Sequence, residues 1–130
     1  MTRVVPASRR PAGSGRDPRP AQPVDGPQVL VVYVPAASTE GLLAALFAAG
    51  AGAIGAYREC AWVTSGVGRF RPLPGATPTL GEVGELVTVQ EDRCELVVPR
   101  GRRDAVIAAL RAAHPYEEPA FHLIDSAPLG

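Results

Sequence analysis

The chain has 130 residues with 13 basic and 13 acidic side chains, a length that suffices for one domain with a hydrophobic core and is short for two. Residues 1–27 contain five Arg and two Asp, whereas the remainder contains eight Arg and eleven carboxylates, so the larger part is mildly acidic and has no basic stripe of the kind that binds nucleic acid. The longest apolar run, Leu42–Ala56, is shorter than the ~20 residues of a membrane-spanning helix, so we expect a cytoplasmic protein that binds neither nucleic acid nor membrane.

The first segment, residues 1–27, differs from the rest in composition. It contains six Pro and five Arg, with no aromatic residue and no apolar periodicity, which predicts a disordered leader. It lacks the apolar stretch of a secretory signal. A transit peptide is a second interpretation, which the proline density disfavours. A third is a start codon assigned too far upstream, with translation beginning near Val24. We therefore place the folded domain at residues 28–130.

The remaining residues alternate between strand and helix patterns. Gln28–Val34 is a β-branched run typical of a central strand that is buried on both faces. Ser38–Gly50 predicts a helix with one apolar face, and Gly50 is placed to end it in a left-handed conformation. The other predicted elements are a strand at Cys60–Ser65, a long strand at Glu85–Val98 that kinks near Glu91, a helix at Arg100–Ala113 with Ala105, Val106, Ala109 and Leu110 facing inward, and a last strand at Ala120–Ile124.

The order of these elements, β-α-β-β-α-β, predicts an α+β fold of the ferredoxin-like class. In that fold, four strands form an antiparallel sheet and both helices cover one of its faces. The other face needs a cover as well, and in a chain this short the simplest cover is another copy of the chain. We therefore expect a homo-oligomer.

A long segment between the second and third strands, Gly66–Gly84, contains five Gly and three Pro, which predicts a loop. Structureless loops of this size are uncommon and are usually functional or mobile. Gly66 and Gly68 are expected to flank a turn with outward-facing N–H groups, which together with Arg69 and Arg71 could hold a phosphate or carboxylate. The alternative is that the loop only packs on an adjacent subunit. The candidate ligand-binding residues are Gly66, Gly68, Arg69, Phe70, Arg71, Pro72, Gly75 and Gly81.

The segment Ala112–Asp125 holds both histidines of the chain and two adjacent carboxylates. One interpretation is a helix stop and strand entry, because His114 lies at a helix end and Pro115 prevents continuation. A second is a divalent-cation site, although the spacing is not that of a known metal motif. A third is contact with a neighbouring subunit. The candidate metal ligands are His114, Glu117, Glu118, His122 and Cys60, so the cofactor is unknown, with a divalent metal ion as the candidate.

No nucleophile stands out in the sequence. Cys60 and Cys94 form no CxxC pair and are interpreted as small buried hydrophobic residues, with soft metal ligands or a redox pair as the alternatives. There is no GxSxG motif and no Cys–His–Asn set. We therefore predict no catalytic residue.

Four stretches taken together, VVYVP, LFAAGAGAIGAYRECAW, GVGRFRPLPGATPTLGEVG and AAHPYEEPAF, carry a resemblance to a known family. They resemble the inserted domain of the NGG-interacting-factor-three-like family, also called YqfO-like proteins or dinuclear-metal-centre hexamers, some of which are named type-two GTP cyclohydrolases. The resemblance runs from Gln28 to Asp125. The chain differs from the family pattern at Arg69, where Thr is usual, and at His122, where an acidic residue is usual.

This resemblance implies a fold and a function. The inserted domain is similar to PII signalling proteins and CutA divalent-cation-tolerance proteins, both of which are trimers of ferredoxin-like subunits. It implies a stand-alone, homotrimeric, regulatory module that binds a metal, a small anionic ligand or a partner protein through its long loop. It implies no catalysis, because the family's two-metal site lies in a larger domain with no counterpart here. The alternatives are an accessory subunit of a metal-dependent hydrolase and a purely structural assembly domain.

Overall fold

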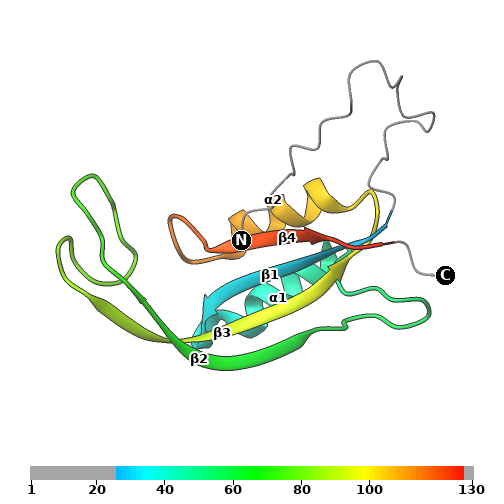
Figure 1. Ribbon diagram of the computed structural model, residues 1–130, viewed down its shortest axis with the longest axis horizontal. Helices are drawn as coiled ribbons and strands as arrows, with labels where there is room; N and C mark the ends of the chain where they lie inside the picture. The colour runs from blue at the N-terminus through cyan, green and yellow to red at the C-terminus, as the bar shows by residue number, and fades with distance from the viewer. Residues whose placement is uncertain (1–25, 128–130) are drawn as a thin grey trace, which may run out of the picture.

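The computed structural model describes residues 26–127, in which two helices lie against one face of a four-stranded antiparallel sheet (Figure 1). The strand order is β2-β3-β1-β4, which confirms the predicted ferredoxin-like fold. The predicted leader lies outside the described residues, apart from its last two. The elements are β1 (Gln28–Pro35), a 3-10 turn (Ala36–Ser38), α1 (Thr39–Ala48), β2 (Trp62–Phe70), β3 (Val87–Val98), α2 (Arg103–Ala113) and β4 (Phe121–Asp125).

The core lies between the sheet and the two helices, and β1 runs through its centre. This strand pairs with β3 on one side and β4 on the other, so its run of β-branched residues has no exposed edge. On α2, Val106 and Leu110 are fully buried, whereas Ala105 is exposed, contrary to its predicted inward position. The buried stripe of this short helix follows the four-residue spacing from Val106, and Ala105 lies beside that stripe. The core cluster comprises Leu30, Val32, Val34, Leu42, Leu43, Leu46, Ala51, Cys94, Leu96, Val98, Val106 and Leu110.

The second strand is longer than its sequence predicts. We expected it to end at Ser65, but β2 continues to Phe70 and pairs with β3 without interruption, also past the predicted kink. Gly66 lies opposite Glu91 and Gly68 lies two residues further along the strand, so neither glycine flanks a turn. A long partner strand supplies the ladder hydrogen bonds that outweigh the weak strand preference of glycine. The irregular connection therefore shortens to residues 71–86.

Within residues 26–127, neither helix is long and apolar enough to cross a membrane.

Candidate ligand-binding site

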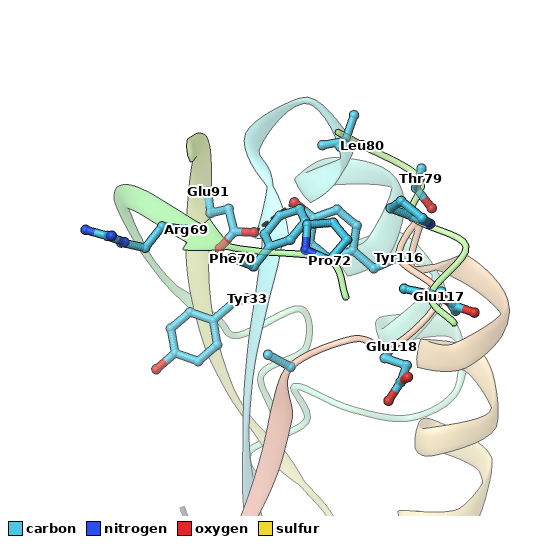
Figure 2. Close-up of a pocket in the computed structure, with 13 residues that line it drawn as sticks. Tyr33, Arg69, Phe70, Pro72, Thr79, Leu80, Glu91, Tyr116, Glu117 and Glu118 are labelled. Atoms are coloured by element: carbon cyan, nitrogen blue, oxygen red, sulfur yellow. Dashed lines mark hydrogen bonds between the residues drawn. The ribbon is translucent and has the colours of Figure 1, made fainter. Parts of the chain in front are cut away.

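The connection 71–86, which we call the β2–β3 loop, folds back to the turn 114–120 between α2 and β4 at one end of the sheet (Figure 1). A cavity of about 280 Å³ lies between the loop and the turn. Figure 2 shows the rings of Phe70, Tyr116 and Pro72 grouped at its centre. The lining residues are Tyr33, Arg69, Phe70, Pro72, Ala76, Pro78, Thr79, Leu80, Glu91, Tyr116, Glu117, Glu118 and Ala120.

The two ends of the β2–β3 loop are tied to each other. The Arg71 guanidinium donates a hydrogen bond to the Gly84 carbonyl over 2.6 Å. The Gly84 N–H donates to the carbonyl of Pro72 over 2.8 Å, and Pro72 itself is buried. A loop whose ends are joined loses less entropy when its middle is ordered, so these bonds help to hold the wall of the cavity in place.

The middle of the loop is fastened to the turn. The Thr79 hydroxyl donates to the Pro115 carbonyl over 2.7 Å. The Thr77 N–H donates to Oε1 of Glu117 over 3.0 Å. Both bonds are exposed, so each contributes modestly to stability. Their role is to set the position of the loop over the cavity.

His114 holds the turn 114–120 against β1. Its side chain is 6% exposed, and its Nε2 donates to the Tyr33 carbonyl over 2.7 Å. Its Nδ1 accepts the Tyr116 N–H over 3.1 Å, so the ring is the neutral tautomer with its proton on Nε2. Burial lowers the pKa of His114, which favours that neutral form. The helix ends at Ala113, which agrees with the interpretation of this segment as a helix stop.

Glu91 reaches into the same region from β3. The Tyr116 hydroxyl donates to its Oε2 over 2.9 Å, and burial together with this carboxylate raises the pKa of Tyr116 well above its usual range. The Tyr116 ring packs edge-to-face on Phe70, with 5.6 Å between ring centroids. A Cβ atom at Gly68 would overlap the Glu91 carboxylate. Glycine is therefore the residue that leaves room for this side chain on the neighbouring strand.

The predicted anion site is not assembled as we expected. Gly66 and Gly68 lie inside β2, and the Arg71 guanidinium is hydrogen-bonded to the Gly84 carbonyl at the other end of the loop. The Arg69 side chain points away from the aromatic rings (Figure 2). Of the eight predicted ligand residues, Arg69, Phe70 and Pro72 line the cavity. Gly75 and Gly81 have φ angles of 102° and 79° and form bends of the loop, where glycine is the residue that takes such angles readily.

The structure also does not bring the five predicted metal ligands together. Among residues 26–127, no group of three or more His, Cys, Asp or Glu side chains could hold a metal ion. Both ring nitrogens of His114 are hydrogen-bonded to the backbone, and His122 lies on β4 opposite Val31. Cys60 contacts the Arg58 carbonyl before β2 begins. Within one chain, these side chains therefore do not form a metal site.

Glu91 and Tyr116 are among the lining residues that sequence reasoning did not name as ligand contacts. Glu91 was interpreted only as part of a strand kink. The two residues are joined by the hydrogen bond from the Tyr116 hydroxyl to Glu91 Oε2, a contact between β3 and the turn after α2. No local sequence pattern signals such a contact.

Comparison with known proteins shows which proteins share this sequence and fold. No family model matches the chain. A curated Mycobacterium tuberculosis protein named GTP cyclohydrolase 1 type 2 homolog is 50% identical over 98 residues, which are 75% of this chain and 26% of that protein. A crystal structure of a Bacillus cereus protein related to NIF3 superposes with a TM-score of 0.66 at 37% identity, covering 77% of this chain and 25% of that one. This chain is a homologue of one segment of the NIF3-related proteins.

The match concerns only part of those proteins. The chain spans about a quarter of the length of the curated relatives it matches. The crystal structure of CutA1 from Pyrococcus horikoshii superposes with a TM-score of 0.57 at 15% identity, covering 79% of this chain and 86% of that one. That likeness shows a shared fold. The resemblance inferred from the sequence is therefore confirmed, as homology to the NIF3-related segment and as a CutA-like fold.

Proposed function

We propose that this protein is a cytoplasmic, homo-oligomeric binding module of the PII/CutA-like type, without catalytic activity of its own. Its ligand binds in the cavity between the β2–β3 loop and the turn 114–120. The observation that carries this proposal is the cavity itself, which has mostly apolar walls and a few positioned polar groups, as small-molecule sites do. A ligand there touches the loop directly, so binding changes the surface that the loop presents to a partner.

The proposed oligomer is supported by the edge of the sheet. β2 pairs only with β3 among the described strands, so its outer backbone groups are free to pair with another chain. Trp62 is 69% exposed and Val67 is 70% exposed on this strand. Exposed apolar side chains along an unpaired edge are typical of an interaction surface. A homotrimer is the assembly that the resemblance to PII and CutA proteins implies.

Native mass spectrometry of the full chain tests this proposal. The protein is purified without chelator and titrated with Zn²⁺, Cu²⁺, GTP and small organic ligands. We expect an oligomer, and one ligand bound per subunit in a way that changes on substitution of Tyr116 by Ala. A monomer at micromolar concentration contradicts the oligomer. If the protein is an oligomer and Tyr116→Ala changes its stability but not the binding of any added ligand, the result supports the structural assembly domain instead.

A second candidate function follows from the homology. A relative named GTP cyclohydrolase 1 type 2 homolog is 50% identical over 98 residues, which are 26% of its length. The chain can therefore act as an accessory subunit to a protein that supplies the remaining part. The test is an affinity purification from the source cell, followed by an assay of GTP hydrolysis with and without added chain. A rate that rises with the chain supports this candidate, and an unchanged rate contradicts it.

A further inference from the structure

We propose that the cavity under the β2–β3 loop takes a small organic cation, such as a protonated amine with an apolar body. This inference rests on the proposed function and names the class of its ligand. It replaces the anionic ligand that Arg69 and Arg71 suggested. The evidence is the charge of the lining, one immobilised carboxylate, the aromatic walls and the size of the cavity.

The charge of the lining is negative. Three carboxylates, those of Glu91, Glu117 and Glu118, line the cavity together with one guanidinium, that of Arg69. Figure 2 shows the Arg69 guanidinium and the Glu117 and Glu118 carboxylates directed away from the rings at the centre of the cavity, so Glu91 is the charged group beside the rings. A phosphate or carboxylate in this place would meet more repulsion than attraction, whereas a cation would be attracted.

One of these carboxylates is held in a defined position. Glu91 lies over Gly68, where any Cβ atom would overlap it, and its Oε2 accepts the Tyr116 hydroxyl over 2.9 Å. Among the described residues, Oε1 accepts no hydrogen bond, so this oxygen can accept an N–H from a ligand. Glu91 is half-buried, and a preorganised carboxylate of this kind loses little entropy when it binds.

The walls beside Glu91 are aromatic. Tyr33, Phe70 and Tyr116 all line the cavity, and the last two form an edge-to-face pair. Aromatic faces attract a cation through the ring quadrupole and accommodate the apolar body of an amine. The cavity measures about 280 Å³. That volume lies just below the ~300–1,000 Å³ range of ligand sites, so the cavity suits a small amine better than a nucleotide.

The test is a titration of the ¹⁵N-labelled full chain with three probes that share one apolar body: cyclohexylammonium, cyclohexanecarboxylate and cyclohexanol. We expect the ammonium ion to shift the amide resonances of residues 70–80 and 114–120 saturably, and the carboxylate to leave them in place. Glu91→Gln keeps the shape of the side chain and removes its charge, and should raise the Kd of the ammonium ion at least tenfold. Glu85→Gln, which lies outside the lining, is the matched control and should not change the Kd.

The outcomes separate this inference from the proposed function. If cyclohexanecarboxylate or cyclohexanol shifts these resonances and the ammonium ion does not, the cationic ligand is refuted and the proposed binding module is retained. If no probe shifts them, this inference fails, and the native mass spectrometry titration decides the proposed function separately. If Glu91→Gln loses the dispersed spectrum of a folded protein, Glu118→Gln decides, because Glu118 lines the cavity without holding Tyr116. An unchanged Kd in a folded Glu91→Gln protein overturns the inference, and so does an unchanged Kd in Glu118→Gln if Glu91→Gln does not fold.

Discussion

The contact between Gly68 and Glu91 gives a sharp prediction about stability. Replacing Gly68 by Ala places a methyl group where the Glu91 carboxylate now lies, so the carboxylate must move, and we expect its bond with the Tyr116 hydroxyl to be lost. A hydrogen bond to a charged group contributes about 1.5–3 kcal/mol. A Gly→Ala change recovers about 0.4–1 kcal/mol by restricting the unfolded chain. We therefore expect Gly68→Ala to lower the free energy of unfolding by about 1–2 kcal/mol.

Gly66→Ala is the matched control for this substitution. The two glycines lie on the same strand, but a Cβ atom at Gly66 meets nothing within 4 Å. Only the unfolded-chain effect then applies, and this variant should be stabilised by about 0.4–1 kcal/mol. The measurement is urea unfolding of both variants at one protein concentration, because an oligomer's stability depends on concentration. A Gly68→Ala protein as stable as Gly66→Ala refutes the reasoning.

A double substitution locates the effect. If Gly68→Ala acts by displacing the Glu91 carboxylate, it should cost almost nothing in a Tyr116→Phe background, which has already lost the same hydrogen bond. Two costs that simply add would show that the methyl group disturbs something else.

Three further outcomes are expected. Burial lowers the pKa of His114 below its usual 6.5, so the folded protein binds a proton at this ring less readily than the unfolded chain does. The stabilisation from the neutral His114 ring is therefore complete above pH 6.5 and is lost as the pH falls through the lowered pKa. His114→Gln should remove this part of the pH dependence of stability, measured by urea unfolding. Leu110→Ala, at a fully buried position, should lower the free energy of unfolding by about 2–5 kcal/mol, against less than ~1 kcal/mol for the exposed Leu86→Ala. Burial raises the pKa of Cys94 to about 11, so a thiol reagent at pH 8 should label Cys60 in the folded protein and Cys94 only after unfolding; labelling of Cys94 in the folded protein would contradict its burial.

Much of the fold could be predicted from local patterns. The β-branched run at Gln28–Val34, the apolar stripes of the two helices and the stop at His114–Pro115 each have a physical cause within a few residues. The order of the elements then left the ferredoxin-like arrangement as the natural packing. The end of β2 was missed, because Gly66 and Gly68 have weak strand preference and are held in the sheet by their partner strand.

The sequence by itself determined the element order, the buried central strand and the kinship with the NIF3-related segment, since these depend on periodicity and on residue identity along the chain. Only the tertiary structure decided which side chains share a site. The turn after α2 is held against β1 by the His114–Tyr33 hydrogen bond, and there Tyr116 meets Glu91 of β3. The register of β2 against β3 places Gly66 opposite Glu91. The reason is that a one-residue shift of register moves every side chain of a strand to the other face, and no local pattern within β2 sets that register.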